Sequence, residues 1–143
     1  MFVSTPILLL LAAAAAASME VSSVRAEPNL EKRSVLAMTE AEEQLSTARK
    51  FQEAGKIEEF RTALKLSGDM LELCYKSLED TGKRARRDPR WFKRAEQKLM
   101  VLLRRIDGLV RDVQSEDRPA AESLQKRARE IHDQLIHDIM SRK

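Results

Sequence analysis

The sequence predicts an all-helical protein that folds as an antiparallel, up-and-down four-helix bundle made of two helical hairpins. Its 143 residues include only 4 Gly, 4 Pro and six aromatic residues, which disfavours β-sandwiches and Gly-rich nucleotide folds. Apolar residues recur at alternating spacings of three and four in four separate stretches, which is the period of a helix. Gly and Pro residues separate these stretches, so each stretch predicts one helix.

Residues 1–26 have the features of a signal peptide. An apolar run of 11 residues from Ile7 to Ala17 suits the core of such a peptide and is shorter than the roughly 20 residues that span a membrane. Val24 and Ala26 place small residues where a signal peptidase reads the chain. We therefore predict cleavage after Ala26, with Ser18 as the second choice.

The mature chain is then expected to be one domain, residues 27–143, with no transmembrane helix, in the periplasm or secreted. No Lys or Arg precedes the apolar run, so an uncleaved anchor and a cytosolic protein that starts at Met19 stay open as alternatives. Cys74 is the only cysteine and forms no internal disulfide, so stability has to come from packing.

The first hairpin is predicted from two helices, residues 29–54 and 56–81. Gly55 separates them, and Gly82 follows the second apolar stripe, where a left-handed residue would close the helix. A kink is expected at Ser67-Gly68-Asp69, because Gly weakens a helix interior. The two stripes are Val35, Met38, Ala41, Leu45, Ala48 and Phe51, then Ile57, Phe60, Leu64, Ser67, Leu71, Cys74 and Leu78.

The second hairpin is predicted from residues 89–115 and 118–140. Asp88 precedes Pro89 and Asp117 precedes Pro119, so each carboxylate is expected to cap the helix that follows. The seams are regular enough for two copies to associate through coiled-coil contacts, so a homo-oligomer stays open. The stripes are Phe92, Ala95, Leu99, Leu102, Ile106, Leu109 and Val113, then Ala121, Leu124, Ala128, Ile131, Leu135 and Ile139.

Between the two predicted hairpins, the chain concentrates positive charge in a segment that we call the basic turn. It holds seven cations within 12 residues, opposed locally by Asp88 alone, and it contains the only tryptophan. Guanidinium groups bind phosphates through paired N–H donors, so the pattern indicates an anion-binding site; a solvated loop is the simpler alternative. The basic turn comprises Lys83, Arg84, Arg86, Arg87, Arg90, Trp91, Lys93 and Arg94.

The expected partners follow from the predicted export. The formal net charge is only +3, so binding of an anion has to depend on local clustering. An exported protein has little access to nucleic acid, which is therefore not expected as a partner. Lipid head groups, acidic cell-wall polymers and the acidic face of another protein remain.

The last predicted helix contains both histidines, His132 and His137. Five residues on a helix turn through about 140°, so the two rings do not share a face. Glu130, Asp133 and His137 do share one and could ligate Zn²⁺ or Cu²⁺, which makes a periplasmic metal-handling protein the alternative function. Such residues are also common on solvated helix faces.

No pattern in the sequence indicates an enzyme. A Gly-rich phosphate loop, a Ser-His-Asp set and a zinc-protease helix motif are all absent, and no cofactor is expected. Cys74 lies on an apolar seam, where a thiol acts as a small hydrophobic side chain. The sequence therefore predicts a non-enzymatic interaction or structural protein of the bacterial envelope.

Overall fold

The computed structural model describes residues 20–141, and these contain helices and no strand. The all-helical class is thus confirmed. A helical segment at residues 20–26 precedes the four long helices and was not among the predicted ones, because the sequence places it within the signal peptide. The long helices are α2 (Leu30–Glu53), α3 (Ile57–Asp80), α4 (Arg90–Asp112) and α5 (Arg118–Met140).

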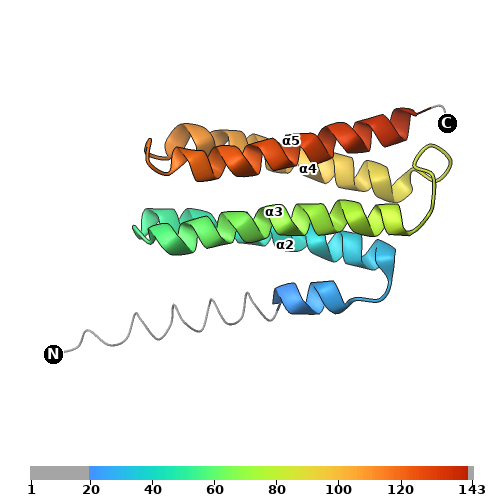
Figure 1. Ribbon diagram of the computed structural model, residues 1–143, viewed down its shortest axis with the longest axis horizontal. Coiled ribbons are helices and arrows are strands. Elements are labelled where there is room, and N and C mark those ends of the chain that lie inside the picture. The colour runs from blue at the N-terminus through green and yellow to red at the C-terminus, as the bar shows by residue number, and fades with distance from the viewer. Residues whose placement is uncertain (1–19, 142–143) are drawn as a thin grey trace.

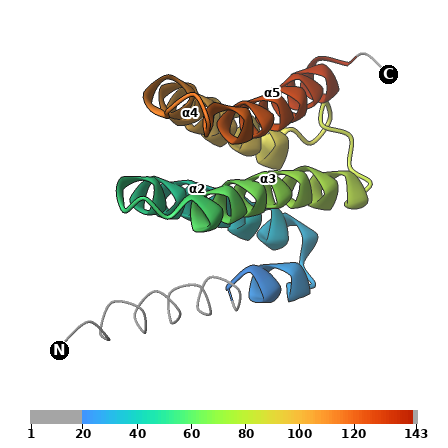
Figure 2. The ribbon, with the colours of Figure 1, turned by 60° about the vertical axis from the view of Figure 1, so that its left-hand side comes forward.

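The four long helices form two antiparallel hairpins that stack on each other (Figure 1). Helix α2 pairs with α3 and α4 pairs with α5, and the hairpins meet mainly where α3 faces α5 and α2 faces α4. Residues 20–26 lie beside the α2–α3 hairpin, on the side away from α4 and α5 (Figure 2). Val21 and Val24 of this segment are buried. The predicted cleavage site after Ala26 therefore follows a segment that packs on the bundle.

The apolar stripes supply the core between and within the hairpins. On α4 the buried residues are six members of the predicted stripe: Phe92, Ala95, Leu99, Leu102, Ile106 and Leu109. The second stripe is wrong at its first member, because Ile57 begins α3 next to the turn at Gly55 and is 36% exposed. A continuous core of this kind is what allows a chain with 34% charged residues to fold.

The helix ends confirm the glycine predictions and contradict the two carboxylate caps. Gly55 and Gly82 have φ of +72° and +69°, the left-handed conformation that ends a helix. Neither α4 nor α5 has a side-chain cap. Asp88 instead lies 3.6 Å from Lys83 Nζ, and Asp117 lies 3.9 Å from Nη2 of Arg61, so ion pairing replaces capping at both carboxylates.

Helix α3 continues through the predicted kink at Ser67-Gly68-Asp69. The Ser67 hydroxyl is fully buried and donates a 2.8 Å hydrogen bond to the carbonyl oxygen of Ala41 in α2. Because this bond joins two helices, it satisfies a buried polar group that would otherwise weaken the core. Ser67 thereby fixes α3 against α2 at the middle of the first hairpin.

Gly68 makes room for an arginine of the second hairpin. A Cβ atom at this position would lie 2.7 Å from Cζ of Arg127 in α5, closer than van der Waals contact allows. The Arg127 guanidinium donates hydrogen bonds to Asp69 Oδ1 at 2.7 Å and to Glu72 Oε1 at 3.1 Å. Arg127 therefore crosses α3 at its one interior glycine and ties α5 to α3.

We predict that Gly68→Ala and Arg127→Ala are energetically coupled. Alanine favours a helix over glycine by about 1 kcal/mol, so Gly68→Ala should raise the free energy of unfolding by about that amount when Arg127 is absent. When Arg127 is present, the new methyl group displaces the guanidinium from both carboxylates, and the gain should shrink by about 1 kcal/mol or more. Urea unfolding of the two single variants and the double variant measures the coupling. An equal effect of Gly68→Ala in both backgrounds would contradict it.

Candidate anion-binding surface

The basic turn joins α3 to α4 and is held by its own backbone. Backbone N–H groups of Arg87 and Asp88 donate to the carbonyl oxygen of Arg84 at 3.0 and 2.9 Å. Ala85 is buried, with an exposed fraction of 5%, and so anchors the turn to the bundle. Arg84, Arg86 and Arg87 flank this anchor and are exposed. The fold therefore holds these guanidinium groups at one end of the bundle.

Lys83 serves the fold rather than the open surface. Its ammonium group binds Glu31 at the start of α2 and lies 3.6 Å from Asp88 Oδ2. The hydrogen bond with Glu31 raises the pKa of Lys83. Lys83 thus links the turn to the first hairpin, and its charge is balanced within the molecule.

Arg90 and Trp91 open α4 as a stacked pair. The guanidinium carbon of Arg90 lies 4.8 Å from the centre of the Trp91 ring, within cation–π range. Trp91 is half-buried and packs against the core. The stacking steadies the Arg90 side chain while leaving its charge at the surface.

The other five cations of the basic turn have no such partners. Within residues 20–141 none of them has a carboxylate within 4.0 Å, and all five are exposed. Their N–H donors are therefore available to a phosphate, sulfate or carboxylate group from outside. These cations are Arg84, Arg86, Arg87, Lys93 and Arg94.

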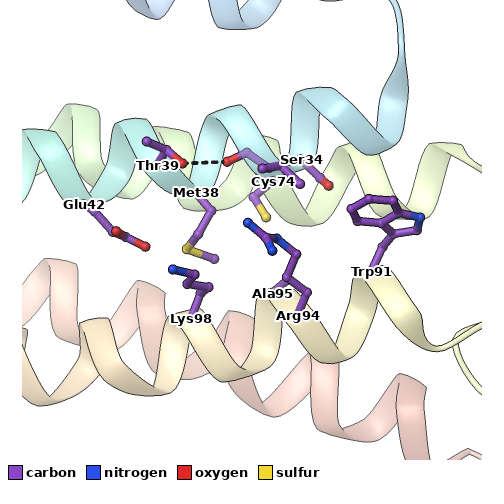
Figure 3. Close-up of a pocket in the computed structure, with 10 residues that line it drawn as sticks. Ser34, Met38, Thr39, Glu42, Cys74, Trp91, Arg94, Ala95 and Lys98 are labelled. Carbon is purple, nitrogen blue, oxygen red and sulfur yellow. Dashed lines mark hydrogen bonds between the residues drawn. The ribbon is translucent and has the colours of Figure 1, made fainter.

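Arg94 also lines a groove between α2 and α4 that the sequence analysis missed (Figure 3). Met38 and Glu42 of α2 form one wall, and Trp91, Arg94 and Lys98 of α4 form the other. The groove forms because two helices that are far apart in the sequence lie side by side. Its only signal in the sequence was therefore the pair of cations Arg94 and Lys98 on one side of α4.

Cys74 of α3 contributes to the floor of this groove and is only 2% exposed. Burial raises the pKa of its thiol to about 12. The thiol therefore stays protonated at neutral pH and is a poor nucleophile. Its position agrees with the expectation of a small hydrophobic side chain on the seam.

The candidate metal residues Glu130, Asp133 and His137 lie exposed on α5. His137 has its Nδ1 atom 3.5 Å from Asp138 Oδ1, while His132 points to α4 with Nε2 3.0 Å from Glu96 Oε1. The two histidines thus face different surroundings, as the helical spacing predicted.

A different carboxylate cluster lies where α2 meets the N-terminal helical segment. Within residues 20–141, three metal-ligating side chains approach within 4.8 Å of one another only at Glu20, Glu40 and Glu43. Glu40 is 5% exposed and accepts a 2.9 Å hydrogen bond from Gln44 Nε2. Burial is the main cause that raises the pKa of Glu40, and the charges of Glu20 and Glu43 add to it.

Comparison of the chain with models of known protein families, with curated proteins and with solved structures finds no match. Within residues 20–141, no helix combines the length and the apolar character needed to cross a membrane. The interpretation of the surface therefore depends on its own geometry and charge.

We predict that Glu40→Gln stabilises, at neutral pH, the chain that retains residues 20–26, because Glu20 of that segment belongs to the cluster around Glu40. The folded state raises the pKa of Glu40, so it binds this proton more tightly than the unfolded chain, and the contribution to stability is lost as pH rises through the folded pKa. The amide keeps the hydrogen bond to Gln44 without the charge. The melting temperature of the variant should therefore exceed that of the wild type at about pH 7 and equal it below about pH 4, as thermal unfolding measures. A difference that does not change with pH would refute this; the exposed Glu59→Gln controls for net charge.

Proposed function

We propose that this protein is an exported, non-enzymatic interaction or structural protein of the bacterial envelope, and that its basic turn binds an anionic partner. In this proposal the mature chain begins at Glu27 and consists of the up-and-down four-helix bundle α2–α5. The apolar run from Ile7 to Ala17, on which the export proposal depends, lies outside the described residues. Cleavage after Ala26 would remove Val21 and Val24 from the first hairpin but no member of the four stripes.

One observation supports the anion-binding proposal above the others: five exposed cations of the basic turn lack a carboxylate partner within residues 20–141. Other cations in the described part of the chain are paired, as at Arg49 with Asp112, or stand singly without a partner, as at Lys50 and Lys65; the basic turn differs because its unpaired cations are crowded into one short segment. Unpaired like charges held on a short turn repel each other, and this unfavourable arrangement is relieved when an anion binds.

The partner classes compatible with this turn are lipid head groups, acidic cell-wall polymers and acidic protein surfaces. All three offer anionic oxygen atoms to guanidinium donors. The hollow next to the turn also contains Glu79 and Asp138, so the arginines are better placed for an extended anionic surface than for a small anion enclosed in a pocket.

We predict that replacing Arg84, Arg86, Arg87 and Arg94 together with Ser weakens binding to heparin, a polyanion, immobilised on a column. The variant should elute at lower salt, and the dependence of log affinity on log salt should become shallower by about one for each contacting cation removed. The matched control replaces Lys50, Lys56, Lys65 and Lys126 with Ser, which removes the same charge from other exposed sites. If both variants elute together, the basic turn is not the binding site.

The alternative proposal, metal handling by Glu130, Asp133 and His137, depends on their shared exposed face on α5. Their ligand atoms do not all lie within 4.8 Å of one another in the structure, so a metal ion would have to draw the three side chains together. Calorimetric titration with Zn²⁺ should in that case release heat that His137→Gln abolishes and His132→Gln preserves. Absence of heat at micromolar protein would reject a metal site on this face.

A further inference from the structure

The basic surface of this protein extends beyond the turn along the whole outer side of α4. The exposed side chains of α4 occupy about 160° of its circumference, opposite the buried stripe. We call this surface the outer face of α4. Its cations are Arg90, Lys93, Arg94, Lys98, Arg104 and Arg111. Arg94 and Lys98 lie at the edge of this face toward α2, where they also line the groove between α2 and α4.

None of these six cations has a carboxylate within 4.0 Å among residues 20–141. The one acidic residue on this face, Asp112, is already bound to Arg49 of α2 at 3.1 Å. Residues 83–112 carry 11 Lys and Arg against 4 Asp and Glu, whereas the rest of the chain carries 15 against 19. Positive charge is therefore concentrated in the segment that forms the basic turn and α4, although the net charge of the chain is small.

The length of this face limits what can bind it. Arg90 and Arg111 are 21 positions apart on one helix, which corresponds to about 32 Å. A single small anion contacts only the cations of one or two turns. Cations repeated along one side of a helix instead match an extended anionic partner, which is either a linear polymer or a flat surface.

Two apolar side chains on the same face distinguish these two partners. Val101 is 56% exposed and lies near the middle of the arc, between Lys98 and Arg104 along the chain, and Met100 at its edge is 40% exposed. A soluble polyanion offers an apolar side chain nothing to contact. The surface of a bilayer does, because apolar groups that pass the head groups enter the acyl boundary.

We propose that the outer face of α4 docks flat on an anionic lipid bilayer. The six cations contact head-group phosphates, and Val101 and Met100 enter the boundary beneath them. This inference rests on the proposed function, because Arg90, Lys93 and Arg94 belong to the basic turn as well. It goes further in naming the partner and in adding Lys98, Arg104 and Arg111, which the turn does not contain.

The test is co-sedimentation with vesicles of phosphatidylcholine, with and without phosphatidylglycerol. Wild-type protein should sediment only with the anionic vesicles. Removing one cation at a membrane surface weakens binding about fivefold, so Lys98, Arg104 and Arg111 replaced together with Ser should weaken it about a hundredfold. Lys50, Lys65 and Lys126 replaced with Ser form the matched control, which should retain wild-type binding. Circular dichroism verifies the helical content of every variant.

The decisive variant is Val101→Ser, which keeps every charge. It should weaken vesicle binding about fivefold and leave heparin retention unchanged. Two results would overturn the lipid inference: Val101→Ser leaves vesicle binding unchanged, or the wild type does not bind anionic vesicles. If the substitutions in the basic turn still weaken heparin retention in that case, the partner is a soluble polymer or an acidic protein. The two proposals can also fail separately. If the Lys98, Arg104 and Arg111 variant loses vesicle binding while the substitutions in the basic turn leave heparin retention unchanged, the α4 face is supported and the turn is rejected as the binding site.

Discussion

The packing of α3 against two different helices is the constraint on which the rest of the structure depends. Ser67 binds the backbone of α2 on one side, and Gly68 admits Arg127 of α5 on the other. These two contacts join α3 to a helix of each hairpin at the same level, and the hairpins also meet where α2 faces α4. The position of α4, and with it the direction of its outer face, follows from that stacking.

The same packing explains why the cations of the turn and of α4 are left without partners. Carboxylates of the first hairpin face the second at particular places, where Asp69 and Glu72 bind Arg127 and Glu31 binds Lys83. Helix α4 packs mainly on α5 and α2, and the one acidic residue on its outer face, Asp112, is bound to Arg49 of α2. The sequence thus concentrates cations in residues 83–112, and the fold adds that six of them lie on the exposed side of α4.

Much of the architecture could be predicted from sequence, because helical periodicity and glycine breaks are local signals. The predictions of helix caps and of a kink were wrong where a side chain contacts a partner that is distant in the sequence or outside its own helix. Asp88 lies one residue before Pro89, the N-cap residue of α4, and Asp117 is the N-cap residue of α5. Neither side chain caps its helix, and each lies next to a cation instead. The kink predicted at Gly68 was wrong, because this glycine makes room for the side chain of Arg127. That role could not be predicted locally, since Arg127 is 59 positions away in the sequence.

The candidate site shows the same division between local and distant information. The basic turn was readable because its cations are adjacent in sequence. The burial of Glu40, the groove beside Cys74 and the partnership of Lys83 with Glu31 each depend on helix placement. Val101 did give a sequence signal, since it interrupts the polar side of α4. Its role as a membrane contact could be inferred only from the structure, which leaves Val101 exposed among cations that have no carboxylate partner within residues 20–141.

The central claim, that the outer face of α4 meets a lipid surface, is tested most directly by a fluorescent probe at position 101. A maleimide dye can be attached to Val101→Cys at neutral pH, because burial raises the pKa of the Cys74 thiol to about 12 and shields it. With anionic vesicles, the emission should shift to the blue and be quenched by nitroxide-labelled lipids, whereas a dye at Lys126→Cys should respond as in water. Vesicle-bound protein whose dye at position 101 remains in a water-like environment would contradict the account.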